Sequence, residues 1–387
     1  MTATVAFPGG MRVALVSHSA RLGGAELCLV ELAEGLVRLR GATAEVVLPA
    51  VGPLAGMLAA AGARPRVVRH YGWATANVPR PAAMLLAVPN ALAIARLARW
   101  LRRERPDVVA TNSITNPAGA YAARLARVPH LWLVNEYGDL DHGYRFALGV
   151  HRTMREVGRL SARVVTCSRA LAWRIGEYVD PAKIEVAYYP VTLGLDRPRV
   201  PAPGAPGAPA MLILGRKHPG KGQADAVRAV ALLRERGCAA SLRVVGETQG
   251  SYGRYLAGLC ASLGLGEEVV LVPRVEDPIA EIDACDVLVL CSRCEAFGRV
   301  VVEAMKRGRP VIATRAGGAQ ELVADSGGGL LYAPGAVSEL ADAAERLGRD
   351  PGEARRLGEK GRAWAEQHCT LAGYADAFLA AARRARA

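Results

Sequence analysis

Short aliphatic runs recur along this chain, and stretches with helical periodicity separate them. Such runs are typical of parallel strands that are buried on both faces and joined by crossover helices. In the first half they predict strands at residues 12–17, 44–49, 66–69, 107–112, 130–135, 162–168 and 184–189. In the second half they predict strands at residues 211–215, 241–246, 269–273, 286–291, 310–314 and 329–333. The pattern therefore predicts an α/β chain of two Rossmann-like domains in series.

A proline-rich segment separates the two halves. Residues 196–210, DRPRVPAPGAPGAPA, contain five prolines and no sustained periodicity, so we expect an exposed linker. The expected N-terminal domain is then residues 1–195, of which 1–10 form a flexible extension, and the C-terminal domain is residues 211–365. Residues 366–387 have a helical pattern, and we expect this helix to pack back on the N-terminal domain. With 387 residues, 51% of them hydrophobic, the chain is long enough for two cores.

The net charge of the chain is strongly positive, but it says little about the partners of the protein. A net charge of +13 could indicate nucleic acid, a membrane surface or acidic small molecules as partners. Nearly all of it is arginine, which indicates a compositional bias and makes bulk charge weak evidence. We expect no nucleic-acid partner. Lysine is rare, so the neighbouring pair Lys217 and Lys221 stands out.

One predicted helix, residues 89–105, carries a cluster of arginines. Its sequence, PNALAIARLARWLRRER, places Arg96, Arg99, Arg102 and Arg103 near one face. Such a helix could rest on anionic lipid, and an ordinary surface helix is the alternative interpretation. No uncharged apolar run of about 18 residues and no secretory signal is recognised, so we expect a cytoplasmic protein, peripheral at most to the inner face of the membrane.

The eight cysteines are scattered, and two of them form a CxxC pair. Cys291 and Cys294 could indicate redox chemistry or half of a zinc site. No second CxxC pair or histidine cluster accompanies them. Because most of the cysteines lie in apolar runs, we expect buried free thiols and no metal site.

Two strand-to-helix turns carry residues suited to phosphate chemistry. Gly23 and Gly24 follow the first predicted strand, where they would let a ligand approach the backbone amides of the next helix. Neither GxGxxG nor an acid at the end of the second strand is present, so no nicotinamide cofactor is predicted. A tight turn onto a packed helix is the alternative interpretation.

The corresponding turn of the second half is cationic. Gly215 is followed by Arg216, Lys217 and Lys221, and a helix begins near Gln223. Cations at such a junction would neutralise a diphosphate and stabilise it as it departs. The turn is not a Walker A loop, and a solvated basic loop is the alternative interpretation.

A second turn of the C-terminal half carries two carboxylates. Glu295 follows a buried predicted strand, and Glu303 lies eight residues later inside a helix. Carboxylates so placed can accept hydrogen bonds from sugar hydroxyls and from a ribose diol, so they need not act as an acid and base pair. Gly317 and Gly318, which precede a helix containing Glu321, would offer exposed amides near a phosphate.

Taken together, these segments resemble glycosyltransferase family 4, the retaining, nucleotide-sugar-dependent enzymes of the GT-B fold. The resemblance extends over essentially the whole chain. It rests on GGAE, VVTCS and GRKHPGKG, and above all on ACDVLVLCSRCEAFGRVVVEAMKRGRPVIATRAGGAQELV, which is similar to the EX7E element of that family.

The resemblance implies a role for each matching residue. Catalysis would fall to Arg216 and Lys221, which bind the donor diphosphate, and to Glu295, which binds the transferred sugar. Glu303 would bind the ribose. Further donor contacts would come from Gly215, from Arg274 and Val275 near the base, and from the amides of Phe297, Gly298 and Arg299 near the phosphates. No metal and no cofactor are expected, and Gly23 and Gly24 would line the acceptor side of a cleft between the two domains.

This chain departs from the family at one position. Many relatives carry a histidine at the end of the strand that here reads HLWLVNEYGD, where this chain has Asn135 followed by Glu136. Either Glu136 or Asp139 then takes a polar role, or the departing phosphate itself receives the acceptor proton, as a retaining front-face mechanism allows. His18 and His142 are candidate acceptor contacts only.

The function implied is transfer of a sugar from a nucleoside diphosphate to an acceptor hydroxyl with retention. The acceptor would be a cell-surface glycan, a lipid or a secondary metabolite. Two alternatives stay open: a non-catalytic nucleotide-sugar-binding module, and a sugar-nucleotide epimerase of GT-B architecture.

Overall fold

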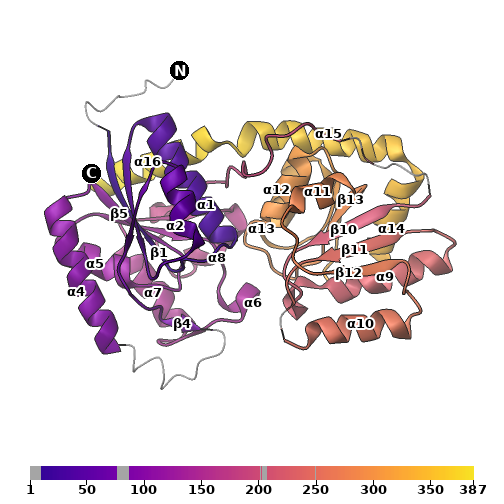
Figure 1. Ribbon diagram of the computed structural model, residues 1–387, viewed down its shortest axis with the longest axis horizontal. Coiled ribbons are helices and arrows are strands. Elements are labelled where there is room, and N and C mark those ends of the chain that lie inside the picture. The colour runs from indigo at the N-terminus through magenta and orange to yellow at the C-terminus, as the bar shows by residue number, and fades with distance from the viewer. Residues whose placement is uncertain (1–9, 76–86, 201, 203–206, 249) are drawn as a thin grey trace. The chain divides into compact units, whose positions relative to one another are not determined.

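The structure of the chain, a computed structural model, describes residues 10–75, 87–200, 202, 207–248 and 250–387 (Figure 1). It divides into two compact units. The first consists of residues 1–191 and 370–387, and the second of residues 192–369. The flexible extension expected at residues 1–10 lies outside the described residues except for Gly10, and parts of the predicted linker lie outside them as well.

The first unit is an α/β unit built on a parallel sheet. Within the described residues its strands have the order β3-β2-β1-β5-β6-β8-β9. The bounds are β1 Arg12–Ser17, β2 Thr43–Leu48, β3 Arg64–Val67, β5 Val108–Asn112, β6 His130–Val134, β8 Arg163–Thr166 and β9 Ile184–Val186. A separate antiparallel ribbon pairs β4 Ala74–Thr75 with β7 Arg145–Phe146.

Helices connect these strands and cover the sheet. They are α1 Gly24–Glu34, η1 Gly35–Leu39, α2 Pro53–Ala60, α4 Ala87–Glu104, α5 Ala118–Ala126, α6 Asp139–His142, α7 Val150–Leu160, α8 Arg169–Gly176, η2 Pro181–Lys183 and α16 Leu371–Arg386. The small side chains of α5, such as Ala118 and Ala122, let it pack closely on α4 and on β5, where Leu97 and Val109 share its core.

The last helix of the chain, α16, belongs to the first unit. It lies beside α1 and the strands of that unit, in yellow in Figure 1. A side chain at Gly35 would approach the Leu371 backbone oxygen to 3.0 Å, so glycine at this position permits the close packing. Arg40 donates to both carboxylate oxygens of Asp376 at 2.6 and 2.7 Å.

The second unit repeats the architecture. Its parallel strands, again within the described residues, have the order β12-β11-β10-β13-β14-β15. They are β10 Ala210–Leu214, β11 Ser241–Val245, β12 Val269–Val272, β13 Val287–Leu290, β14 Val311–Thr314 and β15 Gly329–Tyr332. The helices are η3 Pro219–Lys221, α9 Gln223–Glu235, α10 Tyr252–Ser262, α11 Pro278–Asp283, α12 Arg299–Lys306, α13 Gly317–Ser326, α14 Val337–Arg349 and α15 Pro351–His368.

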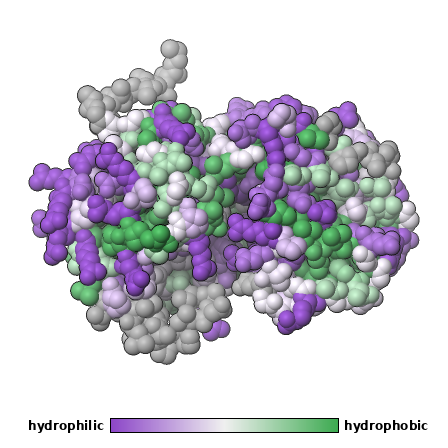
Figure 2. Space-filling view, in the orientation of Figure 1, coloured by the Kyte–Doolittle hydropathy of each residue, from purple (hydrophilic) through white to green (hydrophobic). Residues whose placement is uncertain are grey.

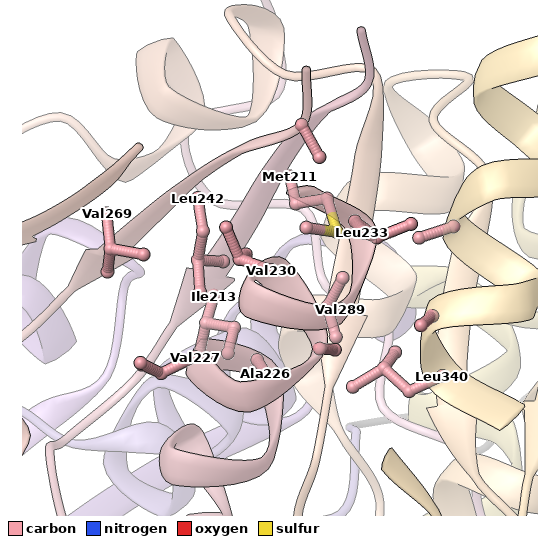
Figure 3. Close-up of a cluster of buried hydrophobic side chains, with 14 of the residues drawn as sticks. Met211, Ile213, Ala226, Val227, Val230, Leu233, Leu242, Val269, Val289 and Leu340 are labelled. Atoms are coloured by element: carbon pink, nitrogen blue, oxygen red, sulfur yellow. The ribbon is translucent and has the colours of Figure 1, made fainter. Parts of the chain in front are cut away.

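Aliphatic side chains fill the space between this second sheet and its helices (Figure 3). Met211 and Ile213 of β10 share this cluster with Val227 and Val230 of α9, and Leu340 of α14 lies at its edge. All five are at most 3% exposed. Burial of this kind supplies the main favourable term for folding, at about 25 cal/mol for each square ångström of apolar surface.

Two buried arginines bind the start of the predicted linker to the second unit. Arg307 donates to the backbone oxygens of Arg197 and Pro198, and Arg309 donates to that of Val200. Arg307 also forms a bidentate pair with Asp283, with Nε–Oδ1 and Nη2–Oδ2 distances of 2.7 and 2.8 Å.

The predicted fold class is confirmed, and each predicted strand has a counterpart within two residues at its start. Among the strands of the described residues, the short β4–β7 ribbon alone was not anticipated. In both sheets the strand order reverses, between β1 and β5 and between β10 and β13. Ligands of such sheets bind at the carboxyl ends of the strands, next to these switch points. No helix of the described residues is long and apolar enough to cross a membrane.

Candidate functional site

In the second unit, the turn after β10 extends a cation from the carboxyl end of the sheet. Gly215 leaves the strand with φ of 149°, a region that favours glycine. The Gln223 side-chain amide at the start of α9 donates to the Arg216 backbone oxygen at 2.9 Å. The Arg216 side chain is exposed and makes no ion pair among the described residues. Arg216 therefore stands on a fixed backbone with its guanidinium available to a ligand.

Of the three cations at this junction, Lys217 does not join Arg216 at the edge of the sheet. Its side chain is buried, and its ammonium group donates to the backbone oxygens of Gly246 and Val272. These oxygens lie at the ends of β11 and β12. Lys217 therefore ties the carboxyl ends of three neighbouring strands together.

Lys221 and Glu295, 74 positions apart in sequence, form an ion pair. The distance from Lys221 Nζ to Glu295 Oε2 is 2.7 Å, and the side chains are 29% and 19% exposed. Glu295 lies in the turn between β13 and α12, and the turns that carry the two residues also meet through a bond from the Arg293 amide to the Gly220 oxygen at 3.2 Å. The fold thus brings Lys221, a candidate to bind the diphosphate, into contact with Glu295, a candidate to bind the sugar.

The glycine pair at the start of α13 supports the Glu295 turn from behind. A side chain at Gly317 would approach the Glu295 oxygen to 2.3 Å, and one at Gly318 would approach the Ala296 oxygen to 2.3 Å. The Gly318 amide donates to the Glu295 oxygen at 2.7 Å. The prediction of an exposed amide at Gly318 is therefore wrong, because this amide is used within the protein.

Helix α12 begins directly after the Glu295 turn. Gly298 is its N-terminal cap with φ of 94°, and the Phe297 side chain is buried, so both would meet a ligand through the backbone. Within the helix, Arg299 Nε lies 3.9 Å from Glu303 Oε1, and both side chains are partly exposed. An anion at this helix start would meet the positive end of the helix dipole.

The remaining predicted donor residues follow β12. Arg274 is exposed and Val275 is half-buried. They lie on the strand end next to β11, whose turn residue Gly246 donates its amide to the Val272 oxygen at 3.1 Å. Both residues are thus at the same carboxyl edge of the sheet as Arg216.

The cysteine pair behaves as predicted for free thiols. Cys291 is buried and Cys294 is half-buried, and neither is in a disulfide. Burial raises the pKa of Cys291 to about 12, so the thiol is protonated at neutral pH. No group of three or more histidine, cysteine, aspartate or glutamate side chains able to hold a metal occurs in the described part of the chain.

In the first unit, the glycine turn after β1 makes room for a contact between Glu26 and His18. A side chain at Gly23 would approach Glu26 Oε2 to 2.6 Å, so glycine here leaves space for that carboxylate, while Gly24 is exposed. His18 Nε2 lies 3.1 Å from Glu26 Oε1. Burial lowers the pKa of His18, which keeps the imidazole neutral at physiological pH. Sequence reasoning did not identify Glu26.

Asn135, at the end of β6, is held by a chain of hydrogen bonds. Its Oδ1 accepts from the Tyr189 hydroxyl at 2.6 Å, and its Nδ2 donates to Asn112 Oδ1 at 2.6 Å. Asn112 Nδ2 in turn donates to the Ala25 oxygen at 3.3 Å. The chain ties the end of β6 to the end of β5 and the start of α1.

Glu136 is buried beside Asn135 and bonds to the turn after β5. Its Oε1 accepts hydrogen bonds from the Ser113 hydroxyl and from the Ile114 amide, the latter at 2.8 Å. Burial is the main cause that raises the pKa of this carboxyl to about 8, and nearby Asp141 and Glu26 raise it further. Glu136 is therefore protonated at neutral pH. Ser113, with φ of 78°, was not identified from sequence.

The two other candidates of this region, Asp139 and His142, lie on the short helix α6. His142 ends the short helix α6, where it stacks on Tyr144, with ring centres 5.1 Å apart. Asp139 begins the same helix, and its carboxylate lies 4.0 Å from the Arg174 guanidinium. Asp139 and His142 thus lie on α6, whereas Asn135 and Glu136 directly follow β6.

Comparison with known proteins matches both units of the chain. The family model described as Glycosyl transferases group 1 matches residues 201–364, and the model described as Glycosyltransferase Family 4 matches residues 22–195. The first range contains all the donor-site candidates, and the second contains the acceptor-side candidates except His18.

Curated relatives agree with these models. A D-inositol 3-phosphate glycosyltransferase of Pseudarthrobacter chlorophenolicus is 32% identical over 237 residues, which are 59% of this chain and 56% of the relative. A 2-deoxystreptamine glucosyltransferase of Streptomyces kanamyceticus is 31% identical over 279 residues, 64% of this chain and 68% of the relative. The match to the inositol phosphate enzyme thus spans little more than half of its length.

A solved structure covers nearly the whole chain. HepE of Anabaena, in complex with UDP, superposes with a TM-score of 0.77 over 96% of this chain and 99% of its own, at 24% sequence identity. At that identity the likeness establishes the fold alone. With both family models and the deoxystreptamine relative, it shows that this chain is a GT-B protein of glycosyltransferase family 4.

Proposed function

We propose that this chain transfers a sugar from a nucleoside diphosphate to an acceptor hydroxyl with retention of configuration. The observation that carries the proposal is the contact between Lys221 and Glu295 at the edge of the second sheet. One is a cation suited to a departing diphosphate, and the other is a carboxylate suited to a sugar. Their turns adjoin the start of α12, where the positive end of the helix dipole favours an anion.

The donor is proposed to bind along this edge. Arg216 and Lys221 hold the diphosphate together with the backbone of Gly215, Phe297, Gly298 and Arg299. Glu303 accepts hydrogen bonds from the ribose hydroxyls, Glu295 binds the sugar, and Arg274 and Val275 contact the base. HepE has been solved with UDP and with UDP-glucose, so uridine donors are the first to test.

In the proposed step, the bond from the anomeric carbon to the diphosphate oxygen breaks and a bond to the acceptor oxygen forms on the same face. The acceptor proton passes to an oxygen of the leaving diphosphate. Arg216 and Lys221 stabilise the negative charge that develops there, which is worth about 3 to 4 kcal/mol for a single well-placed donor.

The acceptor is proposed to be a polyhydroxylated molecule that meets the first unit. Relatives of this chain act, by their names, on D-inositol 3-phosphate and on 2-deoxystreptamine. Gly23 and Gly24, with Asn135 and Glu136, supply the candidate contacts. A glycan, a lipid headgroup or a secondary metabolite would present the same hydroxyl chemistry.

We further propose that α4 rests on an anionic membrane surface. Arg96, Arg99 and Arg103 are exposed, and Leu92 on the same helix is 57% exposed. Figure 2 shows hydrophilic residues gathered over this helix at the left of the view. Co-sedimentation with phosphatidylglycerol vesicles, but not with phosphatidylcholine vesicles, is the expected result. Equal binding to both would contradict the proposal.

A donor-turnover assay tests the proposed reaction. The chain is incubated with a panel of uridine, guanosine and adenosine diphosphate sugars, and release of free nucleoside diphosphate is measured with and without polyol acceptors. A transferase releases it slowly in water and faster with its acceptor. A binding module releases none, and an epimerase converts the donor sugar without releasing the nucleotide.

A further inference from the structure

Asn135 and Glu136, which follow β6, are both candidate acceptor contacts, and their surroundings differ. The amide oxygen of Asn135 accepts from Tyr189, and its nitrogen donates to Asn112. Both polar atoms of this side chain are thus bonded within the unit. In Glu136, both hydrogen bonds reach Oε1, and Oε2 makes no bond to any residue that the structure describes.

The turn that holds Glu136 is strained. Ser113 has φ of 78°, a left-handed conformation that costs a residue other than glycine about 1 to 3 kcal/mol. Its oxygen accepts from Trp132 Nε1 at 2.8 Å, and its amide donates to the Leu133 oxygen at 2.9 Å. The next residue, Ile114, accepts from Trp73 Nε1 at 2.6 Å.

These bonds keep Ser113 in a conformation that aims its hydroxyl at Glu136 Oε1. The two indole rings that support the turn stack at 5.9 Å with an angle of 9° between their planes. Strain maintained by several independent bonds is typical of functional sites, because nothing in local propensity favours it. The turn therefore acts as a rigid clamp on one oxygen of the carboxyl.

We propose that Glu136, and not Asn135, binds the acceptor hydroxyl, donating a hydrogen bond from Oε2 while Oε1 is clamped by Ser113 and Ile114. Ser113 is then a positioning residue. The inference rests on the proposed sugar transfer and specifies how its acceptor is oriented.

A carboxyl that donates suits front-face transfer better than an ionised one. A hydroxyl oxygen that accepts from Glu136 keeps its second lone pair for the anomeric carbon and its own proton for the departing phosphate. An ionised carboxylate would accept that proton instead and compete with the phosphate. Burial and the acids around it, Asp141 on α6 and Glu26 on α1, keep Glu136 protonated, while the His18 imidazole beside Glu26 is neutral.

The test uses the full chain and the donor that it turns over fastest. Water, glycerol, myo-inositol and glucose serve as acceptors, and the most productive of them, water included, is used for kinetics. Glu136→Ala is expected to lower kcat at least tenfold while KM for the donor stays within twofold. Glu136→Gln keeps an N–H donor in the same place and is expected to retain more than a third of kcat.

The pH profile supplies the second readout. Transfer by the wild type is expected to fall as pH rises through about 8, and the fall is absent in Glu136→Gln. Melting temperatures monitor the fold, and if Glu136→Ala does not fold, the pH profile of Glu136→Gln decides alone.

Three results would overturn the inference: full activity of Glu136→Ala, loss of activity in a folded Glu136→Gln, or a high-pH fall that persists in Glu136→Gln. A wild type that turns over no donor, even with water, would instead overturn the proposed function and this inference with it.

Discussion

Replacement of Lys221 by alanine separates catalysis from stability. Lys221 Nζ lies 2.7 Å from Glu295 Oε2 at a partly exposed site, where an ion pair contributes about 1 kcal/mol or less to folding. In transfer, the same ammonium group would stabilise charge on the leaving diphosphate, and loss of one such donor lowers kcat about 10² to 10³-fold. We expect Lys221→Ala to fold nearly as well as the wild type and to lose most of its activity.

Two lysines provide matched controls. Lys217→Met removes the donor to two strand-end oxygens, and each buried acceptor left without a partner costs about 1 to 3 kcal/mol, so this variant should lose stability. Lys360→Ala on the exposed side of α15 should change neither property.

The assay pairs release of nucleoside diphosphate from the donor with urea unfolding of each variant. The reasoning is refuted if Lys221→Ala retains more than a tenth of the wild-type kcat, or if it unfolds several kcal/mol more easily while Lys217→Met does not.

Three further predictions concern the carboxylates and the thiols. Glu303→Gln should raise KM for the donor about tenfold or more with a smaller change in kcat, because it weakens charge-assisted bonds to the ribose; steady-state kinetics with unchanged KM would contradict this. The pKa of Glu136 is about 8 in the folded chain, above its ordinary value of 4.5. The contribution of this raised pKa to the free energy of unfolding is therefore fully present below pH 4.5 and is lost as pH rises to about 8. The free energy of unfolding of the wild type should therefore fall relative to that of Glu136→Gln by about 1.4 kcal/mol per pH unit between pH 5 and 8, and a difference independent of pH in urea titrations would exclude it. The double variant Cys291→Ser and Cys294→Ser should keep its donor turnover, and loss of turnover without unfolding would revive a role for the thiols.

The fold could be predicted from sequence because buried parallel strands are continuous aliphatic runs. The edge strand β3, whose residues are all exposed, was located less well than the central strands, since little burial constrains it. The β4–β7 ribbon is only two residues long in each strand and leaves no periodic signal.

The site could be predicted only as far as residue type indicates chemistry. From the sequence, Lys217 and Lys221 were considered together as cations for a diphosphate, because one sequence alone does not show which lysine side chain is buried against the sheet. The strain at Ser113 was not foreseeable either, because serine has no preference for positive φ and the bonds that hold it come from residues about 20 to 40 positions away. Long-range contacts of this kind determine which candidates reach a ligand.

The stereochemistry of the first product tests the central claim most directly. The chain is given an α-linked nucleoside diphosphate glucose, with UDP-glucose first, and the anomeric protons of the released or transferred sugar are followed by NMR before mutarotation. Retaining transfer predicts that the α-anomer appears first together with free nucleoside diphosphate. Initial formation of the β-anomer, or no release from any donor of the panel, would contradict the account.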